Sequence, residues 1–286
     1  MRQNHTITSF NDSNSWVILS EIEQSIKRKI ESVGTPLKDW DINIYRGVLT
    51  GCNEAFIISG EKRDEILANC RTVEERKKTD ELIRPILRGR DIKRYGYNWA
   101  NLYLIATFPS RHYDIDQYPS VKNYLLSFGM ERLEQTGEIH TVNGETVKAR
   151  KLTKNKWFET QDSIGYWEDF LKPKIIYPET TQGAYFALDT EGLFIDKTCF
   201  FLISPLAEHL QVILSSKLFE FAYKRLFSSV ELGPNGYQYN KQAFLKLPII
   251  KPLGNIISRE VSDNIIYSLY RLTDEEVQYV ENTINN

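Results

Sequence analysis

Residues 42–59, INIYRGVLTGCNEAFIIS, mark the point where the pattern of this chain changes from helix to short strands. Two runs rich in β-branched and aromatic residues, 42–49 and 55–59, flank the turn-forming Gly51 and Asn53. Similar runs recur downstream between Gly, Pro, Asn and Asp, at residues 102–107, 174–177 and 198–203. The pattern predicts an α+β fold with mainly antiparallel or mixed sheets.

Helices are expected before and between these strands. Ser20 and Glu23 form a capping box at the start of an apolar stripe with helical spacing, and Gly34 ends it. Further helices are predicted over residues 72–82 and 118–128, over a long and mostly buried segment near 205–227, and at the C-terminus, where Thr273 and Glu276 form a second capping box.

The bulk composition is that of a globular protein. The chain has 286 residues, of which 41% are hydrophobic and 26% charged. Its formal net charge of -2 argues against a nucleic-acid binder that is basic all over, so the distribution of charge matters more than the sum. Cys52, Cys70 and Cys199 form no CxxC pair, which indicates neither a disulfide framework nor a zinc site, and a cytoplasmic location is expected.

Two short runs concentrate positive charge. Residues 84–95, RPILRGRDIKRY, hold five cations offset only by Asp91, and Gly89 allows a turn that aims them at a ligand. Guanidinium groups suit phosphate oxygens and guanine edges, although an ordinary solvated surface is the alternative interpretation. The candidate DNA contacts in this run are Arg88, Arg90, Lys93 and Arg94.

The second run, residues 148–156, contains no acid and leads into Trp157 and Phe158. Asn143-Gly144 just upstream predicts a two-residue β-hairpin, which would present the run as a protruding basic finger. Its candidate DNA contacts are Lys148, Arg150, Lys151, Lys154 and Lys156.

Two further segments carry side chains of the types that bond bases or phosphates. In the first, around residues 46–53, a tight turn between core strands is the alternative interpretation. The second is the polar loop GPNGYQYNKQ, residues 233–242, in which Asn or Gln could read adenine. The candidates are Arg46, Thr50, Asn53, Asn235, Tyr237, Gln238 and Lys241.

Ten segments in order resemble the TaqI-like C-terminal specificity domain of type II, IIG-like, restriction-modification adenine-specific DNA methyltransferases. They are RGVLTGCNEAFII (46–58), RPILRGRDIKRY (84–95), WANLYLIAT (99–107), YPSVKNYLLSF (118–128), WFETQ (157–161), FLKPKIIYPE (170–179), FALDTEGLFIDKTCFFL (186–202), LSSKLFEFAYKRLF (214–227), GYQYNKQAFLKLPI (236–249) and IYSLYRLTDEEVQYVE (266–281). The resemblance implies a domain that reads duplex DNA.

The resemblance also implies a division of the chain and of the chemistry. Residues 1–38 would be an N-terminal arm and linking helix, 39–254 the target-recognition domain, and 255–286 a C-terminal helical segment packed on it. The chain has neither a glycine loop for S-adenosylmethionine nor an Asn-Pro-Pro-aromatic motif, so no catalytic, cofactor or metal residue is expected in it. A methyltransferase domain that binds S-adenosylmethionine, and often a nuclease domain that needs Mg²⁺, would lie upstream in a longer polypeptide.

Three alternatives stay open at this point. The chain could be a separately encoded specificity subunit, or an interaction module that docks a methyltransferase. The least favoured is a metal-dependent nuclease built on Asp64, Glu75 and Lys77, because this stretch reads as a solvated helix rather than adjacent strands.

Overall fold

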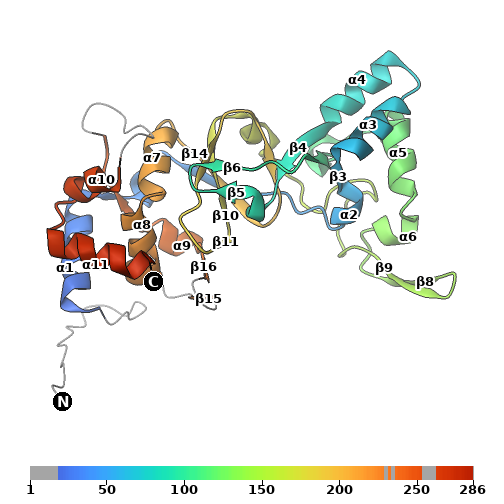
Figure 1. Ribbon diagram of the computed structural model, residues 1–286. Helices are drawn as coiled ribbons and strands as arrows, with labels where there is room; N and C mark the ends of the chain where they lie inside the picture. The colour runs from blue at the N-terminus through green and yellow to red at the C-terminus, as the bar shows by residue number, and fades with distance from the viewer. Residues whose placement is uncertain (1–18, 229–230, 233–235, 253–261, 286) are drawn as a thin grey trace.

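The computed structural model describes residues 19–228, 231–232, 236–252 and 262–285. The molecule is elongated, with α1, α10 and α11 gathered at one end, α3, α4 and α5 at the other, and sheets between them (Figure 1). Within the described residues, no helix is both long and apolar enough to span a bilayer.

A four-stranded antiparallel sheet separates two hydrophobic cores. Its strands, in spatial order, are β12 (Ala187–Asp189), β10 (Lys174–Pro178), β14 (Cys199–Ile203) and β2 (Asn43–Arg46). Successive side chains of a strand point to opposite faces. Tyr177 and Leu202 therefore enter the first core, while Ile176 and Phe201 enter the second. Burial on both faces explains the apolar runs IIYP (175–178) and CFFLI (199–203) in these strands, while Lys174 at the start of β10 is buried in an ion pair with Asp189.

The second core is built on a mixed sheet. Its order is β13 (Phe194–Ile195), β4 (Ile83–Leu87), β7 (Leu102–Ile105) and β3 (Ile57–Ser59), with β13 parallel to β4 and the other pairs antiparallel. The helices of this half are α2 (Asn53–Phe56), α3 (Gly60–Ala68), α4 (Val73–Leu82), α5 (Pro119–Leu126) and α6 (Met130–Leu133). The predicted α+β class with mainly antiparallel or mixed sheets is confirmed.

Short ladders complete the strand pairing. Two-stranded ladders join β1 (Thr35–Pro36) to β17 (Pro248–Ile249), β5 (Ile92–Lys93) to β6 (Gly96–Tyr97), and β8 (Ile139–Val142) to β9 (Glu145–Lys148). A three-stranded sheet consists, in spatial order, of β11 (Thr180–Thr181), β16 (Gly236–Gln238) and β15 (Glu231–Leu232).

The long helix expected near 205–227 is broken. The chain forms α7 (Ala207–Leu214), then α8 (Lys217–Phe221), which continues as a π-helical segment over Ala222–Phe227. Ser216 causes the break because its hydroxyl caps α8, accepting a hydrogen bond from the Phe219 amide at 3.3 Å. The prediction was right about burial and wrong about continuity.

Helices from near both ends of the described chain share the first core. It packs α1 (Glu21–Val33) with α10 (Asp263–Leu269) and α11 (Asp274–Asn285). Both predicted capping boxes are present, and the Glu276 carboxylate also accepts hydrogen bonds from Ser25 Oγ at 2.7 Å and Lys29 Nζ at 2.6 Å. The boundary predicted at residue 38 falls between segments that contribute to this core, whereas the boundary predicted at residue 255 lies outside the described residues.

Candidate nucleic-acid interface

The first cation run forms a tight turn at the end of β4. Arg88 and Asp91 bracket a single 3₁₀ turn over Gly89–Asp91. The Asp91 carboxylate accepts hydrogen bonds from Arg88 N at 2.9 Å, Nε at 3.0 Å and Nη2 at 2.9 Å. Burial alone would raise the pKa of Asp91, but these bonds to Arg88 hold that pKa below its usual value. Arg88 thus shapes the turn while it also lines the groove described below, and its predicted DNA contact stays a prediction.

Gly89 brings the turn close to β14. Its amide donates to Thr198 Oγ1 at 3.0 Å, and a Cβ on Gly89 would lie only 3.1 Å from that oxygen. Thr198 is itself held by Asp196, whose carboxylate accepts from the threonine amide and hydroxyl. Thr198 and Asp196 therefore fix the turn on the side that faces β14. The side chains on its other side face solvent.

Arg90 and Lys93 are those outer side chains, and both are exposed. Lys93 Nζ donates to the Arg90 carbonyl oxygen at 2.8 Å, which holds the two residues together. Among the described residues, neither forms a salt bridge with a carboxylate. Their charges therefore remain available to an anionic ligand.

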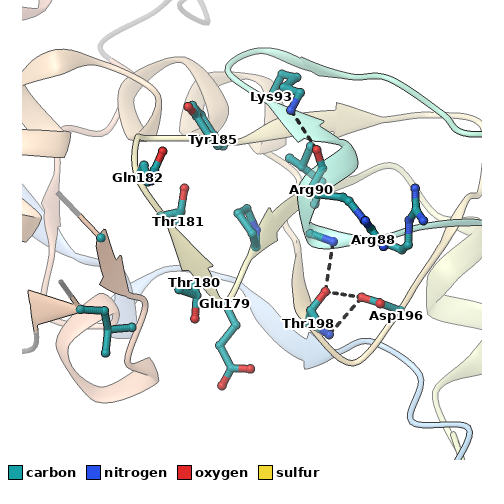
Figure 2. Close-up of a pocket in the computed structure, with 15 residues that line it drawn as sticks. Arg88, Arg90, Lys93, Glu179, Thr180, Thr181, Gln182, Tyr185, Asp196 and Thr198 are labelled. Carbon is teal, nitrogen blue, oxygen red and sulfur yellow. Dashed lines mark hydrogen bonds between the residues drawn. The ribbon is translucent and has the colours of Figure 1, made fainter. Parts of the chain in front are cut away.

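These two cations lie along one wall of a groove. The groove has a volume of about 730 Å³, and its opposite wall carries Thr180, Gln182 and Tyr185 (Figure 2). Hydroxyl and amide groups are the side-chain types that bond base edges and phosphates. No sequence pattern pointed to these three residues, because neutral side chains on β11 and the turn after it carry no distinctive spacing.

Glu179 connects the groove to two other predicted residues. Its carboxylate points away from Arg90 in Figure 2 and accepts hydrogen bonds from Arg46 Nη2 at 2.8 Å and Gln238 Nε2 at 3.1 Å. Arg46 also donates to the Lys197 carbonyl oxygen at 3.1 Å. The fold thus brings Arg46 and Gln238 next to the groove, although they are far apart in the sequence.

The second cation run also contains both internally bonded and exposed side chains. Arg150 is only 4% exposed, and its guanidinium donates to the carbonyl oxygens of Leu133, Thr50, Glu159 and Trp157 at 2.5–2.9 Å. Burial lowers the pKa of Arg150 to about 10. The prediction that Arg150 contacts DNA is therefore wrong, because its donors hold the protein interior together. The remaining cations of the run, Lys148, Lys151, Lys154 and Lys156, are exposed.

Asp162 lies between the groove and the second run. Burial raises the pKa of its carboxyl group, and the positive charges of Arg46 and Lys151 act in the opposite direction. The Asp162 amide is fixed by the Leu49 carbonyl oxygen at 3.1 Å. Arg46, beside the groove, and Lys151, in the second run, are thus both close enough to influence the Asp162 carboxyl group.

Two more candidates have internal roles. Thr50 is buried and donates to Asn53 Oδ1 at 2.6 Å, while Asn53 itself is exposed at the start of α2. Arg94 donates to the Ser215 carbonyl oxygen at 2.7 Å, at the break between α7 and α8, and forms an ion pair with Asp263 at 3.3 Å. The expected DNA contact by Thr50 is wrong, since its side chain is fully buried, whereas the partly exposed Arg94 has a role in the fold and its DNA contact stays a prediction.

The polar loop near residue 236 is split between core and surface. Tyr237 is buried, and its hydroxyl lies 3.2 Å from that of Tyr239, so its assignment as a DNA contact is also wrong. Lys241 is exposed at the start of α9 (Lys241–Phe244). Asn235 lies outside the described residues.

The nuclease alternative depended on Glu75. Its carboxylate is buried and accepts hydrogen bonds from the Arg71 amide at 2.8 Å, the Ser120 amide at 3.1 Å and the Ser120 hydroxyl. It therefore joins α4 to α5. Asp64 and Lys77 lie on helices α3 and α4 rather than on adjacent strands.

Comparisons with known proteins agree with this arrangement. A type II methyltransferase of Geobacillus stearothermophilus, M.BstVI, is 24% identical over 291 residues, covering 94% of this chain and 46% of that protein. The chain thus spans less than half the length of this relative. The solved type IIG restriction endonuclease BpuSI aligns with a TM-score of 0.50 at 14% identity, over 88% of this chain and 28% of that one, and so shares the fold.

The family model described as the TaqI-like C-terminal specificity domain matches residues 84–249, more than half of the chain. The matched region contains the groove, both cation runs and the central sheet except β2. This chain belongs to the TaqI-like C-terminal specificity domain family and is a recognition domain of the restriction-modification type.

Proposed function

We propose that this chain binds double-stranded DNA and recognises its sequence on behalf of an adenine-N6 methyltransferase. The observation that carries the proposal is the groove, where Arg90 and Lys93 face Thr180 and Gln182 without a carboxylate partner in the described part of the chain. The two cations would contact phosphates and set the position of the domain on the duplex. The neutral polar side chains would then supply hydrogen bonds to base edges.

The proposed reaction takes place on a partner domain. That domain, in the same polypeptide or in a separate subunit, would bind S-adenosylmethionine, extrude the adenine and transfer the methyl group; a nuclease domain with Mg²⁺ would accompany it in a restriction enzyme. Recognition by this chain would fix which adenine reaches the partner. The near-neutral net charge supports this division, because much of the phosphate-binding surface would belong to the partner.

Salt dependence of duplex binding tests the DNA-binding proposal. Fluorescence anisotropy with a labelled mixed-sequence duplex is expected to show affinity falling as NaCl rises. Replacing Arg90 and Lys93 together by Ala should lower the slope of log K against log salt by about 2, one for each phosphate that the variant no longer neutralises.

A matched double variant serves as the control. Arg28→Ala with Lys77→Ala also removes one arginine and one lysine charge, but from exposed positions on α1 and α4, away from the groove. It should leave the slope unchanged. Affinity that is indifferent to salt, or an equal decrease of the slope in both double variants, would contradict the proposed interface.

Adenine specificity requires a separate measurement. Genomic DNA from cells that express the chain together with its methyltransferase domain is expected to carry N6-methyladenine at one short motif, detectable by single-molecule sequencing. Methylation only at cytosine would refute the adenine assignment and leave the DNA-binding proposal standing.

A further inference from the structure

The β8–β9 hairpin has one face that no described part of the chain covers. It extends from α6 away from the helices of its end of the molecule (Figure 1). Its turn has φ of 51° at Asn143 and 84° at Gly144, which confirms the predicted two-residue hairpin. The register pairs Ile139 with Lys148 and Thr141 with Thr146.

These four side chains are all exposed, and Ile139 is 67% exposed. They lie on one face, because directly opposed residues share a face and the faces alternate along each strand.

The other face differs in chemistry. His140, Val142 and Val147 are half-buried there. Glu138 and Glu145, the acids at the two ends of the ladder, also belong to that side by their register. The exposed face is thus free of acids and combines two hydroxyl groups, one ammonium group and one aliphatic side chain.

The base of the hairpin is rigidly attached. The Ala149 amide donates to the Glu138 carbonyl oxygen at 2.9 Å, and the Gly137 amide donates to the Arg150 carbonyl oxygen at 2.8 Å. Arg150 is itself held in place, because its buried guanidinium donates to four carbonyl oxygens. The exposed face is therefore held at a defined orientation by the second core.

We propose that this hairpin is a β-ribbon that enters the major groove and reads bases with Ile139, Thr141 and Thr146, while Lys148 contacts a guanine edge or a phosphate. This inference rests on the proposed function and adds a second recognition element to the groove around Arg90. Four residues of strand span about 13 Å at roughly 3.3 Å each, and two strands about 4.8 Å apart fit a major groove about 12 Å wide.

The side-chain types suit this occupant. Threonine hydroxyls bond to either donor or acceptor edges, and an aliphatic group contacts the thymine methyl group. The exposed lysines that follow the ribbon, Lys151, Lys154 and Lys156, would contact the flanking phosphates. A protein partner is less well matched, because one aliphatic residue among hydroxyls lacks the aromatic and apolar content of an interface core.

Selection from a randomised duplex library tests the ribbon. The parent chain and the Thr141→Ala/Thr146→Ala variant would each be used to enrich duplexes, and both would then be titrated with the parent's enriched duplex. The variant is expected to bind that duplex about tenfold more weakly and to lose preference at one or two positions, with an unchanged salt slope. Lys148→Ala should instead weaken all duplexes similarly if it contacts phosphate, and lower the slope by about 1.

Three comparisons make the result decisive. Thr141→Ser/Thr146→Ser keeps both hydroxyls and should retain the motif, whereas Thr190→Ala, an exposed threonine after β12, should change nothing. A parent that selects a motif while the alanine variant selects the same motif with equal affinity would overturn the ribbon and leave the proposed function intact. A parent that shows no salt-dependent binding to any duplex would overturn both.

Discussion

The two cation runs, residues 84–95 and 148–156, have similar charge density but use their side chains differently. In the first run, the Arg88 side chain is bonded to the Asp91 carboxylate. Arg94 donates to the Ser215 carbonyl oxygen and forms an ion pair with Asp263. In the second run, Arg150 is the cation that is buried, and its guanidinium is bonded to internal carbonyl oxygens. Arginine has five donors in a fixed fork and can satisfy several internal acceptors at once, whereas the lysines are left at the surface. The number of cations in a run therefore overstates the charge available to DNA.

The largest effect is expected from Arg150→Ala. The substitution removes the guanidinium donor from four carbonyl oxygens in a buried site, of which, among the described residues, only that of Glu159 keeps a second side-chain donor, Gln135 Nε2, so the free energy of unfolding should fall by about 4 kcal/mol. Urea unfolding followed by circular dichroism measures the change. Arg150→Lys should recover only a small part of it, because an ammonium group cannot reach all four oxygens. A decrease below about 1 kcal/mol would show that Arg150 resembles its exposed neighbours.

Arg88→Ala is expected to have the next largest effect. It leaves the buried Asp91 carboxylate without its two guanidinium bonds, and the free energy of unfolding should fall by about 2 kcal/mol because Arg88 itself is partly exposed. Thermal unfolding measures it, with Arg90→Ala as the control on the same turn. Equal melting temperatures for the Arg88→Ala and Arg90→Ala variants would contradict the proposed role of Arg88 in stabilising the turn.

The pH dependence of the Arg88–Asp91 pair should be a smaller effect than the loss of the guanidinium itself. The pKa of Asp91 is lowered in the folded protein, so the pair stabilises the fold above the unfolded pKa of the carboxyl group. This contribution is lost as pH falls through the lowered pKa, below about 4. Unfolding of the parent and of Asp91→Asn should be compared from pH 7 to pH 3. The difference between them is expected to shrink over that range, and a constant difference would contradict the assignment.

The exposed lysines of the second run should affect stability least. Lys151→Ala with Lys154→Ala is expected to change the free energy of unfolding by less than about 0.5 kcal/mol. The same double variant should lower the salt slope of duplex binding by about 2 if both lysines contact phosphates. Unchanged duplex binding would show that Lys151 and Lys154 do not contact DNA phosphates.

Local features of the fold were predictable because they depend on neighbours in the sequence. The Ser20–Glu23 capping box and the Asn143-Gly144 turn form as expected, since each needs only a few adjacent residues and their preferred backbone angles. The break between α7 and α8 was missed. Ser215 and Ser216 are buried there, and Arg94, distant in the sequence, bonds to the Ser215 carbonyl oxygen.

The site was predictable in part. The sequence located the cationic segments and thereby Arg90 and Lys93. It did not locate Thr180 and Gln182, which reach the groove only because β10 and β11 carry them to its opposite wall. It also placed Thr50 and Tyr237 at the surface, although both fill interior positions.

The sequence by itself determined the α+β class, the hairpin, the helix caps and the positions of positive charge, because periodicity, turn chemistry and composition are local properties. Only the tertiary structure decided which of these charges face solvent. That choice depends on whether carbonyl and carboxylate oxygens from distant segments converge on a guanidinium group. They converge on Arg88, Arg94 and Arg150. Within the described residues, they leave the side chains of Arg90, Lys93 and the exposed lysines of the second run without a salt bridge to a carboxylate.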